Sequence, residues 1–361
     1  MKRWIAWAVA AITVAALFFP CSVQAVSAEK AIVLDAATGR ILYQKDAHSK
    51  SLIASTTKIM TALVVCEQCN VLSRVRIPAE AVGVEGSSMY LQADEVLTVQ
   101  ELLYGLMLRS GNDAAVALAI YCGGTIEGFA QLMNDKARAL GLKNTHFANP
   151  HGLDAPDHYS TAYDLAILTA NAMENPIFAM TVGAKQVTIG QRQLRNHNKL
   201  LWSMPEAEGV KTGYTKAAGR ILVSSACRDG RRLICVTINA PDDWNDHKQL
   251  LSQGFSGFGL QQVVSAGETV GVIRVAGGQQ RDVTLVASDD FFYPIAPGEQ
   301  VRLLLPGAGF VYAPVEAGSE AGRAHILIDG QSVGTVSLVY GETVPMNSQP
   351  KPKPKRWWPW A

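Results

Sequence analysis

Ser55-Thr56-Thr57-Lys58 stands directly before an apolar run, Ile59 to Cys66, and this combination constrains the fold more than any other stretch. The run predicts a helix, which places Ser55 and Lys58 on one face near the positive end of the helix dipole. A serine becomes a nucleophile when a positioned base accepts its proton, and a lysine kept neutral by burial or a nearby cation can be that base. On its own, the motif also fits a helix cap beside a solvated lysine.

Two later motifs favour the nucleophile. Ser110-Gly111-Asn112 lies between two apolar-periodic segments, and Lys211-Thr212-Gly213 precedes a run typical of a β-strand. S-x-x-K, S-x-N and K-T-G in this order, with such spacings, form the signature of the penicillin-binding proteins and the serine β-lactamases. Three matched motifs are far more specific than one.

The residues in and around the motifs distinguish between the families that share this signature. The chain resembles the low-molecular-mass D-alanyl-D-alanine carboxypeptidases from about Ala31 to Phe258, and the β-rich segment that follows also fits that family. Class A β-lactamases typically carry S-D-N where this chain has Ser110-Gly111-Asn112, which favours the carboxypeptidases. The stretches that carry the resemblance are Ala54 to Ala62, Arg109 to Ala115, Asn149 to Asp154 and Gly209 to Thr215.

Predicted strands stand at both ends of the catalytic region, with hairpin turns at Thr38-Gly39 and Asp229-Gly230. These strands are Ala31 to Leu34, Ile41 to Gln44, Arg220 to Ser225 and Leu233 to Ile238. We expect the two ends of the region to meet in one sheet, with a helical cluster packed against it and the active site at the junction. The predicted fold class is α+β, a β-lactamase/transpeptidase-like catalytic domain followed by a small all-β sandwich.

Helix signals divide the middle of the chain. A capping box at Thr98 to Glu101 opens a helix that delivers the Ser110 loop, and Gly123-Gly124 and Gly141 end later helices. Residues 144–159 are rich in turn formers and predict a long loop. The further predicted helices are Asp113 to Tyr121, Thr125 to Leu140, Thr161 to about Glu174 and Asp246 to Gly254.

The resemblance implies a role for each catalytic motif residue. Ser55 Oγ would attack the carbonyl of the penultimate D-alanine, or of a β-lactam ring, and give an acyl-enzyme. Lys58 would be the neutral amine that accepts its proton. Ser110 would relay a proton to the departing amine, and Asn112 would hydrogen-bond both the substrate amide and Lys58.

The residues of the third motif are expected to bind substrate. Lys211 would hold the terminal carboxylate, and its charge would help to keep Lys58 unprotonated. Thr212 would support carboxylate recognition, and Gly213 would let the substrate backbone lie along the strand edge. By the family pattern, the backbone N–H groups of Ser55 and Tyr214 would form the oxyanion hole.

Residues 144–164 comprise the predicted long loop and the first turn of the helix that follows it. Their carboxylates are relevant to the release of the acyl group. Class A β-lactamases activate the hydrolytic water with a loop glutamate. Here the only carboxylates are Asp154, Asp157 and Asp164, of which Asp154 is expected in a turn and Asp164 as a helix cap. We therefore predict slow release of penicillin but turnover of D-Ala-D-Ala peptides. His151 and His197 are expected to be structural, because a lone histidine is weak evidence of a triad.

Residues 1–28 form a predicted signal peptide, with Lys2 and Arg3 before an apolar run and cleavage expected after Ala25 or Ala28. A retained anchor is disfavoured because the run is shorter than the roughly 20 residues that span a bilayer. Without this leader and the tail, 26 Lys and Arg face 31 Asp and Glu, so nothing supports nucleic-acid binding. We expect an exported protein at the outer face of the cytoplasmic membrane or in the cell envelope.

The chain has six cysteines, and five would remain after loss of Cys21 with the leader. An odd number argues against a complete disulfide framework. Cys66 and Cys69 form a C-x-x-C without a second pair at zinc spacing, and are interpreted as partly buried thiols near a helix end. In the predicted hairpin register Cys227 and Cys235 are not opposite each other on the two strands, so we expect no disulfide between them.

Beyond the catalytic domain, predicted here as residues 29–260, short β runs separated by turn formers predict a sandwich domain at 262–345 without catalytic residues. The tail, residues 346–361, alternates proline with lysine and ends with three tryptophans, which excludes the amphipathic helix usual in the family. Its basic and aromatic residues suit a lipid interface, and a disordered solubilising tail fits equally well.

The predicted function is a serine-type D-Ala-D-Ala carboxypeptidase that trims peptidoglycan stem peptides and is covalently inhibited by β-lactams. A β-lactamase and a catalytically idle cell-wall scaffold are the alternatives. The missing loop glutamate disfavours the first alternative, and the intact motifs disfavour the second. The mechanism requires no cofactor and no metal.

Overall fold

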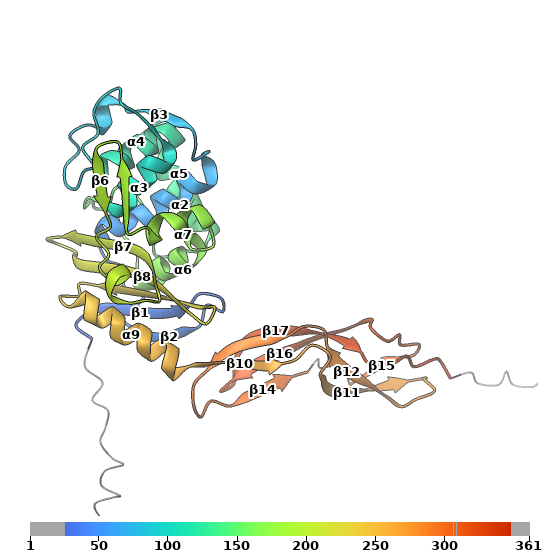
Figure 1. The fold of residues 1–361 in the computed structure, drawn as a ribbon. Helices are drawn as coiled ribbons and strands as arrows, with labels where there is room; N and C mark the ends of the chain where they lie inside the picture. The colour runs from blue at the N-terminus through green and yellow to red at the C-terminus, as the bar shows by residue number, and fades with distance from the viewer. Residues whose placement is uncertain (1–25, 306, 308, 348–361) are drawn as a thin grey trace, which may run out of the picture. The chain divides into compact units, whose positions relative to one another are not determined.

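The computed structural model describes residues 26–347 apart from 306 and 308, and these residues form two compact units (Figure 1). The catalytic unit consists of 26–33, Tyr43–Cys227 and Ile234–Leu250. The C-terminal unit consists of Leu34–Leu42, Arg228–Leu233 and 251–347. Most of the predicted leader and tail, residues 1–25 and 348–361, lies outside the described residues.

A five-stranded sheet joins the two ends of the catalytic region in the order β2-β1-β9-β8-β7. Asp229 and Gly230 turn the chain between β8 and β9 with φ of 53° and 79°, the left-handed pair that a two-residue hairpin requires. The strands are β1 (Lys30–Asp35), β2 (Ile41–Lys45), β7 (Ala207–Thr215), β8 (Gly219–Arg228) and β9 (Arg231–Ile238). The prediction that both ends meet in one sheet is confirmed, and β7 lies at its edge.

Helix α2 (Lys58–Gln68) lies at the centre of the helical cluster. It packs against each of five other helices, and its side chains from Lys58 to Val65 are all buried. The surrounding helices are α3 (Val99–Leu108), α4 (Asn112–Gly123), α5 (Ile126–Ala139), α6 (Ala162–Ala172) and α7 (Pro176–Gly183). The apolar run that follows Ser55 therefore forms the core of the catalytic unit.

Several helix ends follow the signals in the sequence. Thr98 and Glu101 make both hydrogen bonds of the predicted capping box at the start of α3. Thr125 caps α5, and Gly124 ends α4 with φ of 76°, a conformation that glycine adopts without strain. The predicted helices and loops are therefore delimited by local hydrogen bonds.

Asp164 does not cap its helix as expected. Thr161 is the N-cap of α6, and Asp164 is the third residue of that helix. Its carboxylate accepts hydrogen bonds from Asn144 N–H and Thr145 Oγ1 at 2.8 and 2.7 Å. Asp164 thus ties the start of the long loop to the helix that follows it.

Some short elements have no counterpart in the predictions. One of them is α7, which Asn175 caps and Pro176 opens. The remaining short elements are η2 (Ala54–Thr57), β3 (Arg74–Arg76), η3 (Ala79–Ala81), β4 (Val96–Thr98), β5 (Gln186–Ile189), β6 (Arg192–Arg195) and α8 (Leu200–Ser203).

Helix α9 (Asp243–Gly257) covers one face of the five-stranded sheet, and the helical cluster covers the other (Figure 1). The ring of His247, fully buried, lies 2.6 Å from Ser224 Oγ on β8 and 2.9 Å from Thr237 Oγ1 on β9. Burial lowers the pKa of His247 to about 3, so the ring is a neutral hydrogen-bonding bridge.

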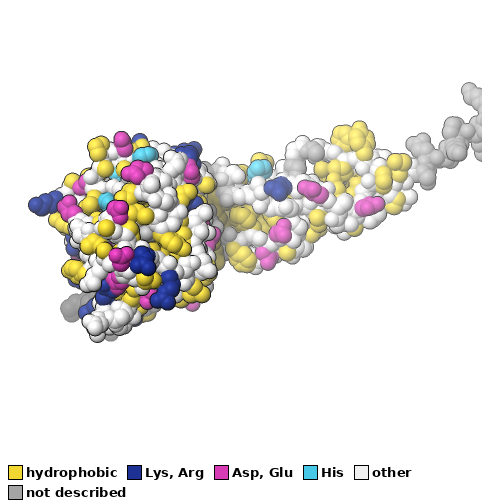
Figure 2. All heavy atoms as spheres, turned by 90° about the horizontal axis from the view of Figure 1, so that it is seen from above, with side chains coloured by type: hydrophobic (Ala, Val, Ile, Leu, Met, Phe, Trp, Pro, Cys, Tyr) yellow, Lys and Arg dark blue, Asp and Glu magenta, His cyan; other side chains and the backbone are white. Residues whose placement is uncertain are grey.

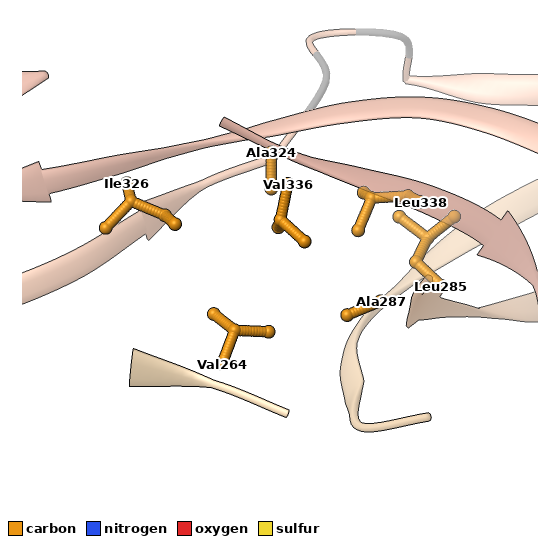
Figure 3. Close-up of a cluster of buried hydrophobic side chains, with 7 residues drawn as sticks. All are labelled: Val264, Leu285, Ala287, Ala324, Ile326, Val336 and Leu338. Carbon is orange, nitrogen blue, oxygen red and sulfur yellow. The ribbon is translucent and has the colours of Figure 1, made fainter. Parts of the chain in front are cut away.

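The C-terminal unit is built from two sheets. A six-stranded sheet has the order β14-β16-β17-β12-β11-β15, and β10 pairs with β13 in a second sheet. Val264 of β10 points into a cluster of aliphatic side chains on the larger sheet (Figure 3). The strands are β10 (Gly259–Val264), β11 (Thr269–Ala276), β12 (Asp282–Ala287), β13 (Phe291–Ile295), β14 (Val301–Leu304), β15 (Phe310–Tyr312), β16 (Glu320–Ile328) and β17 (Gln331–Tyr340).

This arrangement is the predicted small β-sandwich. Strand β10 begins at Gly259, within the stretch that the sequence assigned to the catalytic domain. Within the described residues, no single helix is both long and apolar enough to cross a membrane; only α4 and α5 together meet that test, with a bend of 83° between them.

Candidate active site

Ser55 lies in the short helix η2, directly before α2. The turn is held by its neighbours, because Thr56 Oγ1 donates to Ile53 O at 2.5 Å and Thr57 Oγ1 donates to Ala54 O at 2.8 Å. Ala54 has φ of 44°, in the left-handed region that costs a non-glycine residue on the order of 1–3 kcal/mol. The surrounding contacts therefore hold Ser55 on a strained turn.

His158 supports this turn from the loop before α6. Its Nδ1 accepts a hydrogen bond from Ala148 N–H at 3.0 Å, so its proton is on Nε2, which lies 2.7 Å from Thr57 Oγ1. Burial lowers the pKa of His158 to about 4, which keeps the ring neutral. Gly152 packs against the same turn, since a Cβ there would lie 1.9 Å from Ala54 O. No pattern in the sequence pointed to His158, because its partner is distant along the chain.

Lys58 has the partners expected of the base. Its Nζ lies 3.1 Å from Ser55 Oγ and donates to Asn112 Oδ1 and His151 O, each at 2.6 Å. The side chain is fully buried. Burial, and then the nearby Lys211 amine, lower the pKa of Lys58 well below its ordinary value, although Asp113 acts in the opposite direction.

The loop after α3 brings the second motif to the same place. Ser110, buried with φ of 61°, lines one cleft together with Ser55. Asn112 opens α4, and its Nδ2 donates to Glu85 O at 2.5 Å. The Asp113 carboxylate, to which no sequence motif assigns a role, accepts hydrogen bonds from Ser88 Oγ and from two backbone N–H groups of the neighbouring loop.

The third motif lies on edge strand β7. Lys211 is fully buried, its Nζ donates to Thr212 O at 2.7 Å, and burial lowers its pKa to about 7. Gly213 packs against η2, because a Cβ there would lie 3.3 Å from Ser55 N and from Ile53 O. The glycine thus lets the strand approach the Ser55 turn, a reason not foreseen from the sequence. Tyr214 is 65% exposed, at the cleft.

Neither histidine that could suggest a triad pairs with Ser55. His151 contributes its carbonyl to Lys58, and its Nδ1 accepts from Leu153 N–H at 3.2 Å. His197 lines the cleft, where burial, Lys211 and Arg109 lower its pKa to about 4.

Two of the three carboxylates in residues 144–164 are bonded elsewhere, and the third, Asp157, is exposed. Asp154 accepts a hydrogen bond from Thr215 Oγ1 at 3.2 Å, and Asp164 binds the start of its own loop. Over residues 26–347 with their two gaps, no carboxylate is hydrogen-bonded to Ser55 or Lys58. The same residues contain no group of three or more His, Cys, Asp and Glu that could hold a metal ion.

The motif residues border a cleft of about 720 Å³. Ser55, Ser110, Thr212, Gly213 and Tyr214 line it, whereas Lys58 and Lys211 are buried. The three motifs, which are far apart in the sequence, therefore meet at one cavity of the catalytic unit.

The cleft is strongly cationic. Arg220 pairs with Asp243 at 2.7 Å, and Asp243 is the single carboxylate among the described lining residues. Within the described chain the other lining cations have no carboxylate partner; they are Arg109, Arg195 and Lys199. The Arg195 guanidinium lies 5.1 Å over the Trp202 ring. This charge suits an anionic ligand.

Comparison with known proteins agrees with this geometry. A family model described as D-alanyl-D-alanine carboxypeptidase matches residues 18–242. A second model, described as the C-terminal domain of penicillin-binding protein 5, matches residues 258–346. The two matches correspond to the helix-and-sheet region that holds the three motifs and to the β-sandwich.

Individual relatives and solved structures agree with the family-model matches. The chain is 33% identical to D-alanyl-D-alanine carboxypeptidase DacF of Bacillus subtilis over 320 residues, 84% of this chain and 82% of the relative. Penicillin-binding protein 5 of Haemophilus influenzae superposes with a TM-score of 0.76 at 31% identity, covering 90% of this chain and 100% of that one. A point mutant of the K15 DD-transpeptidase of Streptomyces superposes with a TM-score of 0.63 at 34% identity, and the match covers 64% of this chain and 99% of that one.

The predicted resemblance and fold class are confirmed by these matches. The chain therefore belongs to the serine-type D-alanyl-D-alanine carboxypeptidases, the low-molecular-mass penicillin-binding proteins.

Proposed function

We propose that this enzyme removes the terminal D-alanine from peptidoglycan stem peptides through an acyl-enzyme on Ser55. One observation carries the proposal: a fully buried Lys58 amine with a lowered pKa lies 3.1 Å from Ser55 Oγ. A serine and a base in hydrogen-bond reach are the parts that nucleophilic acyl transfer requires.

The partners of Lys58 match a neutral amine. A neutral amine has two N–H groups and one lone pair, and the two N–H groups are taken by Asn112 Oδ1 and His151 O. The lone pair is then left for the Ser55 hydroxyl. As the Ser55 oxygen bonds to the substrate carbonyl carbon, its proton passes to Lys58 Nζ, and the carbonyl oxygen becomes an oxyanion.

The backbone supplies donors for that oxyanion in this proposal. Ser55 N–H and Tyr214 N–H are the two donors, and the close packing of Gly213 against Ser55 N supports their proximity. Ser110 and Asn112 then act on the leaving group. The proton held by Lys58 passes through the Ser110 hydroxyl to the departing D-alanine amine, while Asn112 holds the peptide amide.

Lys211 and Thr212 hold the terminal carboxylate of the substrate. Burial alone lowers the pKa of Lys211 to about 7, and a bound carboxylate stabilises the ammonium form. Substrate binding therefore strengthens the positive charge that disfavours protonation of Lys58. The unpaired cations of the cleft attract the same anionic peptide.

Release of the acyl group distinguishes peptide from penicillin. Residues 144–164 contain no glutamate, and Asp154 and Asp164 are bonded elsewhere. Among the described residues, no carboxylate is hydrogen-bonded to Ser55 or Lys58 to activate water as in a class A β-lactamase. We therefore propose that β-lactams acylate Ser55 and leave it slowly, and that they act as covalent inhibitors.

The proposed place of action is the cell envelope, reached by export with cleavage of the leader after Ala25 or Ala28. Figure 2 shows hydrophobic side chains gathered on part of the C-terminal unit. Phe310 and Tyr312 are two of its exposed aromatic residues, at 48% and 74%. We propose that residues 262–345 and the tail, 346–361, bring the catalytic domain, 29–260, to a membrane or wall surface.

The test is release of the terminal alanine, of either configuration, from a synthetic peptide ending in D-Ala-D-Ala, compared with the same peptide ending in D-Ala-L-Ala. We expect release from the first peptide only, and none from Ser55→Ala. Ser87→Ala, which changes another hydroxyl of the cleft, should remain active. Catalytic consumption of penicillin without release of D-alanine would instead identify a β-lactamase.

A further inference from the structure

Cys69 and Cys122 form a pair that the C-x-x-C pattern did not suggest. Cys69 ends α2, its N–H donating to Val65 O at 3.0 Å, and Cys122 is the next-to-last residue of α4. The two helices pack together, and the two thiols share a side-chain hydrogen bond. The neighbour of Cys69 across the fold is therefore Cys122, although Cys66 is closer in sequence.

The three thiols of this region differ in reactivity. The hydrogen bond from Cys122 lowers the pKa of Cys69, while burial raises that of Cys66 to about 12. The thiolate is the form that attacks a disulfide, so Cys69 reacts first. Cys69 and Cys122 are both partly exposed, and Gln68 and Tyr121 beside them are exposed, which gives a small oxidant access.

We propose that Cys69 and Cys122 form a reversible disulfide that ties the ends of α2 and α4 together. The oxidant is another disulfide, such as oxidised glutathione or the disulfide of a thiol oxidoreductase. Cys69 thiolate attacks it, forming a mixed disulfide and releasing one thiolate. Cys122 sulfur then attacks Cys69 sulfur, releases the second oxidant sulfur, and gives up its proton. Two protein thiols lose two electrons, and one oxidant disulfide becomes two thiols.

The opposite ends of the same helices carry catalytic groups. Lys58 opens α2 and Asn112 opens α4, and their Nζ and Oδ1 atoms lie 2.6 Å apart. An 11-residue helix such as α2 is about 16 Å long, so the disulfide is outside contact with the active site. The bond would hold the helix pair at its far end, leave the chemistry unchanged, and stabilise the fold by restricting the unfolded chain.

The experiment treats the reduced full chain with oxidised glutathione, alkylates the remaining thiols and maps the peptides by mass spectrometry. We expect a cross-linked peptide joining Cys69 to Cys122, two hydrogens lighter than its reduced parts, with no glutathione retained at either residue. Cys66→Ser should form the same bond. Cys122→Ser should keep glutathione on Cys69, because the resolving thiol is gone.

A second measurement compares the unfolding temperature of oxidised and reduced protein. The wild type and Cys66→Ser should gain several degrees on oxidation, whereas Cys122→Ser should gain none. The proposal is overturned by a Cys66–Cys69 cross-link, by stable glutathione on Cys69 in the wild type, or by an oxidised wild type no more stable than the reduced one.

Discussion

The catalytic unit buries polar side chains in its interior, whereas residues 251–347 have a core of hydrophobic side chains. Lys58, Lys211, Asn112 and Asp113 are all almost completely buried in the first. The core of the second includes the aliphatic cluster of Figure 3 and two smaller hydrophobic clusters, and none of its described Asp, Glu, Lys, Arg, His, Asn, Gln, Ser or Thr side chains is buried.

This difference shows where the protein gives up stability for chemistry. A buried amine loses its hydration, and only a good set of partners compensates for that loss. In the catalytic unit burial lowers the pKa of Lys58 and Lys211, and for Lys58 a lowered pKa is what general-base catalysis at neutral pH requires. Residues 251–347 contain none of the proposed catalytic residues, and their described buried side chains are hydrophobic.

The largest expected effect is that of Lys58→Met on acylation. Removal of the base should lower kcat/KM for peptide, and the rate of acylation by penicillin, by about 10²–10⁴-fold. Stopped-flow or mass-resolved acylation rates measure this. Lys216→Met, at an exposed position, is the matched control and should react at the wild-type rate. If Lys58→Met were acylated at a rate within a few-fold of the wild-type rate, buried Lys58 would not be the base, and this contrast between the two units would fail.

Leu338→Ala tests the hydrophobic core of the C-terminal unit. Leu338 is fully buried in the C-terminal core, so its truncation should lower the free energy of unfolding of that unit by about 2–5 kcal/mol. At temperatures where the variant is folded, kcat/KM for a soluble peptide should not change. Calorimetry with parallel kinetics provides both values, with Val272→Ala, on an exposed side chain, as control. A large fall in kcat/KM would show that the chemistry depends on the C-terminal core.

Lys211→Met measures the free-energy cost of burying a lysine amine, because that cost makes the stability of the wild type depend on pH. The folded pKa of Lys211 is about 7, below its ordinary value of 10.5. Between these values the unfolded chain binds a proton that the folded protein does not, so wild-type stability gains from rising pH. The Lys211 contribution is most favourable above pH 10.5 and is lost as pH falls through 7.

Chemical unfolding of wild type and Lys211→Met across this pH range measures the contribution. The difference in unfolding free energy should grow in favour of the wild type with pH, by a few kcal/mol in total. Lys216→Met should show no such trend relative to wild type. Parallel curves for wild type and Lys211→Met would mean that Lys211 titrates normally in the folded protein.

The smallest effect belongs to the cleft rim. Arg195 is exposed, and its guanidinium stacks on Trp202 rather than pairing with a carboxylate. Arg195→Gln should lower kcat/KM for an anionic peptide only about 2–5-fold at low salt, and the difference should fade as salt screens the charge. An effect that persists at high salt would indicate direct contact with the substrate rather than attraction from a distance.

The sequence was sufficient for the features that depend on local pattern. S-x-x-K on a helical turn placed Ser55 beside Lys58, and the Thr98 capping box and the Asp229-Gly230 hairpin are local hydrogen-bonding patterns. The motif order carried the resemblance, and with it the fold class.

The features that were missed depend on contacts between distant segments. His158 reaches Thr57, Asp164 binds Asn144 N–H instead of capping its helix, and Cys69 meets Cys122 rather than Cys66. No residue pattern around these positions specifies a partner far along the chain. Asp164 shows the limit most clearly, because a carboxylate in the first helical turn resembles a cap whether or not it makes one.

The most direct test of Ser55 as the acylated nucleophile is intact-mass spectrometry of the protein after addition of penicillin, followed over hours. We predict one adduct per chain, on the peptide that contains Ser55, absent from Ser55→Ala, present in Ser87→Ala, and persisting after excess drug is removed. An adduct that survives in Ser55→Ala, or that maps to another residue, would contradict the assignment of Ser55 as the nucleophile.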